Sequence, residues 1–173
     1  ILKEAGYRKR RPSKALATGK SPFRSEQFHI VFYFANLFAC MDHNPILSID
    51  TKKKERLGQL DRSGRVLCKT APVVFDHDYP HLSEGKIVPH GIYDLKLNKG
   101  YISIGTNNET AAMIADNLIW WWEGFGIHAY PDAREILLFC DCGGANGYRH
   151  YAFKKELLRV AQYIGIKIVV VHY

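Results

Sequence analysis

Two aspartates in this sequence come at the ends of short apolar segments of strand length. Asp50 ends the segment ILSID, and Asp141 follows ILLFC. A helix-forming segment between them provides a crossover, so we expect two parallel neighbouring strands whose carboxyl ends meet at one sheet edge. Facing carboxylates repel each other unless a cation lies between them, and such hard oxygen ligands suit Mg²⁺ or Mn²⁺. The pattern predicts a divalent-metal site for phosphodiester chemistry, in which two ions activate a water or a 3′-hydroxyl and stabilise the leaving oxygen.

Each aspartate taken alone also has a structural explanation. An Asp at a strand end often caps the following turn through its side chain, and Asp141 precedes the glycine-rich segment 143–147. That segment has two interpretations, a tight turn beside the acid or a cradle whose backbone N–H groups bind a phosphate. It matches neither a P-loop nor a dinucleotide fingerprint. On the residues alone, these alternatives stay open.

Basic residues follow the first aspartate and fill the start of the chain. The run after Asp50 is compatible with a solvated charge run and with phosphate contacts. Residues 1–24 carry eight Lys and Arg against one Glu, which accounts for the whole net charge of +7 and leaves a neutral remainder. We call residues 1–24 the N-terminal arm. We expect nucleic-acid contacts from this arm and from the run after Asp50, namely from Lys9, Arg10, Arg11, Lys14, Lys52, Lys53 and Lys54.

Several further residues have weaker signals. Asp76–Asp78 and His81 could supply metal ligands, but a loop of surface polar residues explains them more simply. Asp94 lies within a predicted strand, where a paired structural acid is expected. The rings of Trp120–Trp122 cannot all face one core from a single helix, so we expect one or two of them to be exposed.

Length and composition limit the class of protein. The chain has 173 residues, with 47% apolar and 24% charged residues, which favours one globular domain with an arm and excludes a wholly disordered chain. No apolar run approaches the roughly 18–20 residues of a membrane span, and the N-terminus lacks a secretory signal. Four cysteines without metal-site spacing predict buried thiols in a reducing cytosol.

The predicted elements alternate in a way that defines a fold class. After a helix that Ser25 could cap and that extends to Ala39, the hydrophobic pattern predicts a hairpin and a strand–helix–strand–helix–strand series, with only weak signals over 57–90. We expect Gly100 to supply the positive φ of the hairpin turn. The ranges are strand 46–50, possible strands 65–68 and 73–76, hairpin strands 91–97 and 101–106, helix 110–124, strand 135–140, helix 149–164 and strand 167–171. This predicts an α/β domain with a mixed sheet and helices on both faces, in the order of the ribonuclease-H-like fold. The helix that should follow the final strand is missing.

Four segments in order carry a resemblance to a known family. ILSIDTKKKE, HDYPHLSEGKIVPHGIYDL, TAAMIADNLIWWW and DCGGANGYR resemble the DDE transposases of the ISAzo group of bacterial insertion sequences, which have a ribonuclease-H-like core. LKEAGY resembles the end of the family's helix-turn-helix region. The family often has glycine where this chain has Cys142 and serine where it has Ala145, which alters the turn after Asp141.

The resemblance implies specific roles. Residues 1–24 would be the end of the helix-turn-helix region with a basic linker, and 25–173 an incomplete catalytic core. The first two catalytic acids would be Asp50 and Asp141, which would also hold the metal, Mg²⁺ or Mn²⁺, as two ions in the intact enzyme. The third acid, a Glu, would lie beyond the final strand. Glu156 lies on the preceding helix and is not assigned that role.

The implied activity is cleavage and strand transfer at the ends of an insertion sequence. The partners would be element-end and target DNA, with a possible homo-oligomer, in the cytoplasm on the nucleoid. Because the third acid is absent, we expect this fragment alone to be inactive. Two alternatives are a ribonuclease-H-like nuclease without transposition and a non-catalytic DNA-binding remnant.

Overall fold

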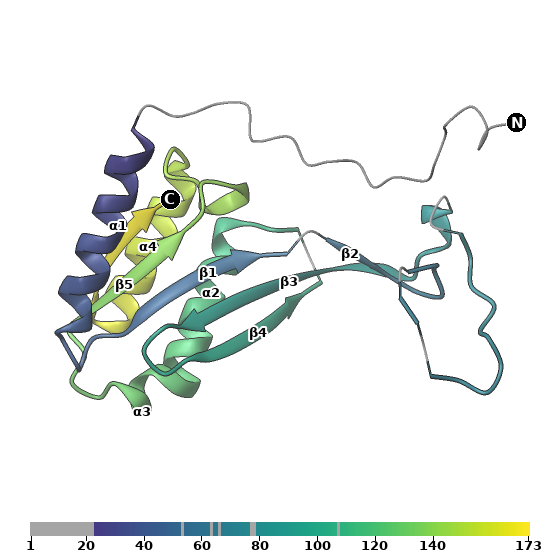
Figure 1. The fold of residues 1–173 in the computed structure, drawn as a ribbon, viewed down its shortest axis with the longest axis horizontal. Helices are drawn as coiled ribbons and strands as arrows, with labels where there is room; N and C mark the ends of the chain where they lie inside the picture. Colours follow the sequence, from purple (N-terminus) through teal and green to yellow (C-terminus); the bar gives the residue numbers. More distant parts are fainter. Residues whose placement is uncertain (1–22, 53, 63, 66, 77–78, 107) are drawn as a thin grey trace, which may run out of the picture.

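A computed structural model describes residues 23–173, apart from 53, 63, 66, 77–78 and 107. Its centre is a six-stranded mixed sheet in which the main order is β4-β3-β1-β5-β6, with β2 paired to the outer part of β3 (Figure 1). The strands are β1 (Ile46–Thr51), β2 (Glu55–Leu57), β3 (Gly85–Asp94), β4 (Lys99–Gly105), β5 (Glu135–Cys140) and β6 (Lys167–His172). The predicted ribonuclease-H-like order of elements is confirmed.

Strand direction follows from the connections. The β3–β4 hairpin and the β1–β3 pair are antiparallel, so β1 and β4 run the same way. β1 pairs with β5 in parallel, and β5 with β6, because helices form the crossovers between these strands. The carboxyl ends of β1, β4, β5 and β6 therefore lie along one edge of the sheet.

Helices cover both faces of the sheet. One face carries α1 (Arg24–Ala39), and the other carries α2 (Ala111–Trp121) and α4 (Tyr151–Ile164). Thr110 caps α2 because its hydroxyl oxygen accepts the N–H of Met113 at 3.2 Å. At the end of α4, Gly165 adopts a left-handed φ of 71°, a conformation that glycine reaches without a steric penalty.

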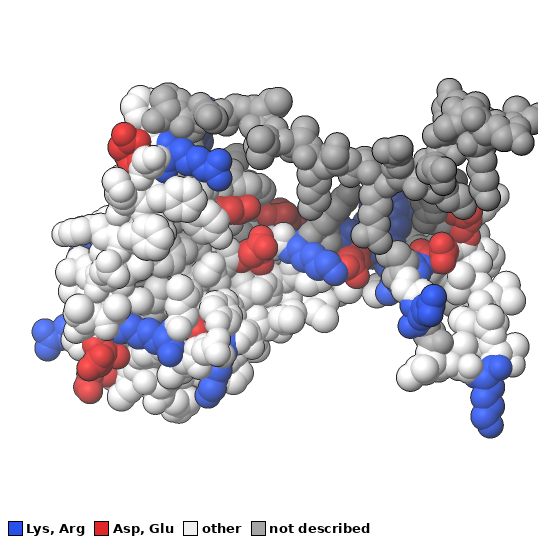
Figure 2. Space-filling model, in the orientation of Figure 1, with Lys and Arg blue, Asp and Glu red and all other residues white. Residues whose placement is uncertain are grey.

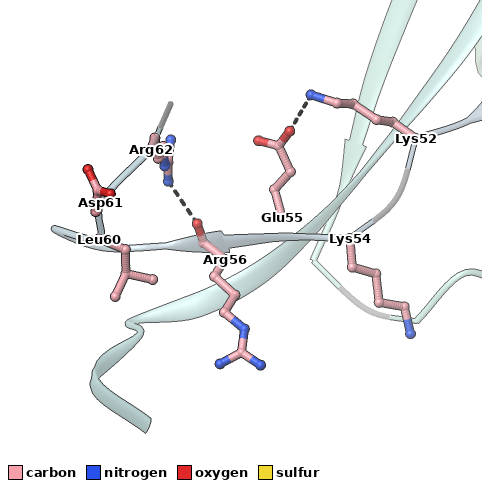
Figure 3. A pocket seen from close by; sticks show the side chains of 7 residues that line it. All are labelled: Lys52, Lys54, Glu55, Arg56, Leu60, Asp61 and Arg62. Carbon is pink, nitrogen blue, oxygen red and sulfur yellow. Dashed lines mark hydrogen bonds and ion pairs between the residues drawn. The ribbon is translucent and has the colours of Figure 1, made fainter. Parts of the chain in front are cut away.

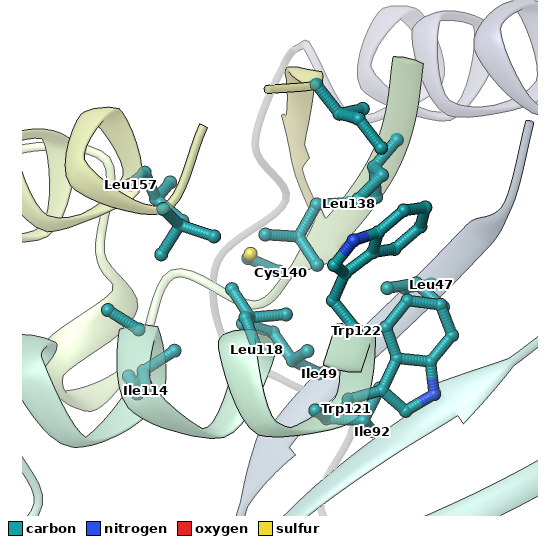
Figure 4. Close-up of a cluster of buried hydrophobic side chains, with 14 of the residues drawn as sticks. Leu47, Ile49, Ile92, Ile114, Leu118, Trp121, Trp122, Leu138, Cys140 and Leu157 are labelled. Atoms are coloured by element: carbon teal, nitrogen blue, oxygen red, sulfur yellow. The ribbon is translucent and has the colours of Figure 1, made fainter. Parts of the chain in front are cut away.

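Strand alternation divides the core into two layers. Even-numbered residues of β5 pack under α2 and α4, as Leu138 and Cys140 do in Figure 4, whereas Leu137 and Phe139 face α1. In α1, Phe38 is fully buried, whereas Phe28 and Phe32 are exposed. Only part of the apolar face of this helix is therefore packed against the sheet.

The helix predicted over 110–124 changes character part-way. It is α-helical to Trp121 and continues as a π-helical segment, η2 (Trp122–Gly126), before a short α3 (Ile127–Ala129). Trp121 at the end of α2 and Trp122 at the start of η2 are both buried in the core, while Trp120 stays 43% exposed. One exposed indole agrees with the sequence expectation.

Other boundaries were wrong for local reasons. In the hairpin, Asn98 rather than Gly100 has the positive φ, because Gly100 already pairs with Tyr93 in β4. The described residues of 65–68 and 73–76 form no strand, and Phe75 makes only an isolated bridge to Leu60. Ser25 is not a helix cap, since α1 begins at Arg24.

The weakly patterned segment projects from the domain. β2 and the outer part of β3 carry it away from the helices, on the right in Figure 1. We call the described residues from 52 to 84 the β2 arm. No helix among the described residues is long and apolar enough to cross a membrane.

Candidate functional site

Asp50 and Asp141 lie at neighbouring ends of β1 and β5. Ile49 is paired with Cys140 in the parallel register, and each aspartate is the next residue in its chain. Since Ile49 faces the α2–α4 layer, alternation along β1 directs Asp50 to the opposite side, whereas Asp141 follows the end of β5 and starts the next turn. The structure thus brings the two predicted site residues together. They line one cavity of about 90 Å³.

The turn after Asp141 is tight and internally bonded. It contains the short 3₁₀ segment η3 (Gly144–Asn146), and Gly144 has a φ of 55°. Asn146 donates its side-chain N–H to Oδ1 of Asp141 at 2.8 Å. The backbone N–H of Ala145 is donated to Oε1 of Glu109 at 3.2 Å, so it is not available to a phosphate. These contacts favour the tight-turn interpretation over the phosphate cradle.

Glu109 is a site residue that the sequence analysis missed. It precedes the cap residue of α2 and lines the same cavity as Asp50 and Asp141. A Cβ at Gly144 would overlap its carboxylate, so any other residue there would displace the Glu109 side chain, and the positive φ of Gly144 also favours glycine. The available signal was positional: Glu109 follows β4, whose carboxyl end lies at the same sheet edge as those of β1 and β5.

A buried histidine on β3 lies beside the end of β1 that carries Asp50. His90 of β3 is paired with Thr51 of β1, is 1% exposed, and has no hydrogen-bond partner on either ring nitrogen. Burial lowers the pKa of His90 to about 4, although the charge of Asp50 acts in the opposite direction. His90 is therefore neutral at neutral pH and adds no positive charge beside the carboxylates.

The oxygen donors suit a hydrated divalent cation. Mg²⁺ is commonly held by one or two carboxylates together with waters and substrate phosphates. Asp50 and Asp141 provide two such groups, and the cavity also contains Asn146, whose side-chain oxygen is buried without a partner. Among the described residues, no three His, Cys, Asp or Glu side chains gather as a complete metal site. The donors therefore fit an ion whose remaining ligands come from water and substrate.

The basic residues near the site belong to the β2 arm. Lys52 forms an ion pair with Glu55, and Lys54 donates to Asn108 at 2.9 Å. Figure 3 shows Lys54 and Arg56 extending from one side of β2 and Glu55 from the other. In Figure 2, blue and red side chains alternate over this projecting part of the molecule. Lys53, Lys9, Arg10, Arg11 and Lys14 lie outside the described residues.

A cleft of about 600 Å³ runs along the same arm. Its lining includes Lys54, Arg56 and Arg62, and the Arg62 guanidinium donates to the backbone oxygen of Arg56 at 2.8 Å. Two acids, Glu55 and Asp61, also line it. Arg56 and Arg62 extend the basic run that the sequence analysis limited to the three lysines.

The remaining candidates have structural roles or none that the contacts support. Asp94 is fully buried and accepts hydrogen bonds from Tyr130 and from two backbone N–H groups, as expected for a structural acid. His77 and Asp78 lie outside the described residues. The cysteine prediction was mostly wrong, because Cys40, Cys68 and Cys142 are exposed. Burial raises the pKa of the Cys140 thiol to about 12.

Comparison with known proteins places these features in context. Residues 1–173 match the family model described as Rhodopirellula transposase DDE domain. No curated protein matches the chain.

The fold is shared with solved structures of a transposase. The Mos1 transposase paired-end complex with left transposon end has a TM-score of 0.53 at 12% identity, over 96% of this chain and 47% of that chain. The Mos1 mariner paired end complex with Mn has a TM-score of 0.51 at 11% identity, over 96% and 48% respectively. The chain thus spans about half the length of these relatives, and at such identity the likeness shows the fold alone.

Proposed function

Because the chain belongs to the Rhodopirellula transposase DDE domain family, we propose that Asp50 and Asp141 hold the divalent cations for cleavage and strand transfer of DNA. DDE transposases act in DNA transposition and depend on divalent metal. The single observation that carries the assignment is the β1–β5 register, which sets the two carboxylates side by side at a cavity.

The residues of this chain have separate tasks in that reaction. The cations, when bound, activate a water or a 3′-hydroxyl and stabilise the leaving oxygen of the phosphodiester. Asp50 and Asp141 would hold them through carboxylate oxygens, with DNA phosphate and water as the remaining ligands. His90 stays neutral and buried, so the negative charge of Asp50 remains available to metal.

The DNA partner would be held mainly by charge. Lys54 and Arg56 extend from one side of β2 (Figure 3), the strand that follows the end of β1 carrying Asp50. They would neutralise phosphates of element-end and target DNA together with Lys52, Lys53 and four residues of the N-terminal arm. These four are Lys9, Arg10, Arg11 and Lys14. Such contacts position the duplex without reading its sequence. Assembly as a homo-oligomer and association with the nucleoid belong to the same proposal.

A metal titration tests the assignment directly. Calorimetric titration of the chain with Mn²⁺ should show binding that Asp50→Asn and Asp141→Asn each reduce strongly. The matched control is Asp132→Asn, an exposed acid in the turn before β5, which should bind Mn²⁺ as the wild type does. Equal binding in all four proteins would contradict the assignment.

Cleavage assays with the intact enzyme separate the alternatives. A transposase should cut element-end DNA with Mg²⁺ and then join the freed 3′ end to target DNA. Cutting without joining would favour a nuclease, whereas DNA binding that persists in the Asp50→Asn, Asp141→Asn double variant without any cutting by the wild type would favour a remnant. The expected inactivity of residues 1–173 alone stays a prediction for the same assay.

A further inference from the structure

We propose that Asn146 and Glu109 are positioning residues that fix the Asp141 carboxylate for the cation, an inference that rests on the proposed function. Neither residue is one of the acids assigned to the chemistry. Both line the cavity of Asp50 and Asp141, and both hold the turn that follows β5.

Asn146 acts on the carboxylate itself. Its side-chain N–H is donated to Oδ1 of Asp141 at 2.8 Å, which restrains rotation of that carboxylate. The other oxygen, Oδ2, lies 2.8 Å from the point where a Cβ of Gly143 would stand. Asn146 therefore holds Asp141 at one of its two carboxylate oxygens, and the glycine at position 143 leaves room for the other. This hydrogen bond restrains the orientation of the carboxylate before any ion binds.

Asn146 is also unusual as a buried residue. It is 3% exposed, and its side-chain oxygen has no hydrogen-bond partner. Leaving a buried polar atom unpaired costs folding free energy, so this amide is not explained by stability alone. The amide orientation that leaves this oxygen unpaired is the one in which the side-chain N–H is donated to Asp141.

Glu109 and His172 hold the turn from two different elements. The Glu109 carboxylate, at the start of α2, accepts the N–H of Ala145 at 3.2 Å. At the end of β6, the His172 ring Nε2 lies 2.8 Å from the backbone oxygen of Asn146, within hydrogen-bond distance. Because α2 packs on α4 and β6 pairs with β5, the turn is attached to rigid parts of the domain. This support keeps Asn146 in register with Asp141.

The two residues differ in how they would be detected. Outer-shell partners of metal ligands typically change metal affinity about 10–100-fold when they are removed. Asn146→Leu keeps similar volume but removes the donor and the unpaired oxygen together. Glu109→Gln keeps an oxygen that accepts the Ala145 N–H but removes the charge, whereas Glu109→Ala removes both. Charge and positioning are therefore separable at Glu109.

The experiment measures Mn²⁺ affinity by calorimetry and thermal unfolding in a chelator for each variant of the full chain. Asn146→Leu should weaken Mn²⁺ binding about 10-fold or more while unfolding stays near that of the wild type. Glu109→Ala should also weaken it, and Glu109→Gln should recover most of that loss. If Asn146→Leu does not fold, Asn146→Ala is the second variant, with the same expected loss of affinity.

A buried asparagine elsewhere provides the matched control. Asn44 is 2% exposed and accepts the N–H groups of Arg134 and Glu135 at the opposite end of β5. Asn44→Leu should lower the unfolding temperature without changing Mn²⁺ affinity.

The possible failures are distinguishable. Unchanged Mn²⁺ affinity in Asn146→Leu would overturn the positioning role while leaving the metal assignment intact. Equal losses in Glu109→Gln and Glu109→Ala would show that the Glu109 charge acts directly, and would overturn its positioning role. A wild-type chain that binds no Mn²⁺ would overturn both this inference and the metal site of the proposed function.

Discussion

The carboxylate edge and the β2 arm are built in opposite ways. At the edge, each aspartate ends a strand of the central sheet, and the turn beside Asp141 is bonded to α2 and approached by β6. In the β2 arm, the described residues contribute to neither hydrophobic cluster, and apolar side chains such as Leu67 and Phe75 are exposed. One region is rigid and the other is held by few packed contacts.

The difference matches the demands of the two tasks. Metal coordination requires oxygens at defined positions, which packed strands and short turns provide. Phosphate neutralisation needs charge near the DNA but tolerates variable geometry, so exposed side chains on a projecting arm suffice. Substitutions at the carboxylate edge should therefore change metal affinity, and substitutions in the β2 arm should change salt-dependent DNA binding. Neither set should have much effect on the other property.

The largest effect is expected from the aspartates themselves. Asp50→Asn or Asp141→Asn should reduce Mn²⁺ affinity by more than about 100-fold, beyond the range typical of outer-shell partners. Neutralising either side chain also relieves repulsion between the pair, so the apo protein should be no less stable to unfolding. Calorimetry and thermal denaturation of the same samples measure both quantities. A variant that lost stability in parallel with metal affinity would indicate a structural role instead.

The next effect concerns the buried imidazole behind the edge. The pKa of His90 is about 4 in the folded chain and about 6.5 when unfolded, so the unfolded chain binds more protons between these values. Its contribution to stability is complete above about pH 6.5 and is lost as the pH falls towards 4. The expected loss is up to about 3 kcal/mol. Urea denaturation across this range measures it.

Two variants isolate the contribution of His90. His90→Gln should flatten the pH dependence of the unfolding free energy between pH 6.5 and 4, because the new side chain does not titrate. His128→Gln, at an exposed position in α3, should leave the wild-type profile in place. An unchanged slope in His90→Gln would show that another group causes the acid sensitivity.

The sequence was sufficient for the edge because local and long-range signals agreed there. Apolar runs ending in Asp50 and Asp141 define strands, and the crossover between them requires a parallel pair. Glu109 could not be found in this way. Its contact with Ala145 spans 36 residues and depends on how α2 sits against the turn after β5.

The β2 arm resisted prediction for a different physical reason. It has no periodic apolar face, because it packs against neither helical layer, and so neither strand nor helix spacing is imposed on it. The start of β3 was missed for the same reason, since Gly85–Ile87 pair only with β2. In α1 the reverse occurred. The helical spacing of apolar residues in α1 was clear, yet Phe28 and Phe32 are exposed. Periodicity predicts that a helix has an apolar face, but it does not show whether another part of the protein packs against that face.

A smaller effect at the edge should come from Gly143. Its φ of −92° is open to alanine, but a Cβ there would stand 2.8 Å from Oδ2 of Asp141 and force the carboxylate to move. Gly143→Ala should weaken Mn²⁺ affinity about 10-fold. The unfolding free energy should change little, since the displaced group is the end of one side chain and not the backbone. Gly124→Ala, where no atom lies within 4 Å of the added Cβ, is the control. Equal affinities in both variants would show that Asp141 adapts without cost.

The smallest effect per residue is expected in the β2 arm, on the salt dependence of DNA binding. Lys54→Gln and Arg56→Gln should each reduce the slope of log affinity for duplex DNA against log salt by about 1, the value for one lost phosphate contact. Mn²⁺ affinity should be unchanged, because neither residue lines the cavity of Asp50 and Asp141. Lys155→Gln, on the exposed surface of α4, should leave the slope as it is. Two outcomes would show that the regions are not separate in function. One is a change of Mn²⁺ affinity in Lys54→Gln or Arg56→Gln, and the other is a change of the salt slope in Asp141→Asn as large as the change in those two variants. Independent responses would show that the rigid edge holds the metal while the exposed arm holds the DNA.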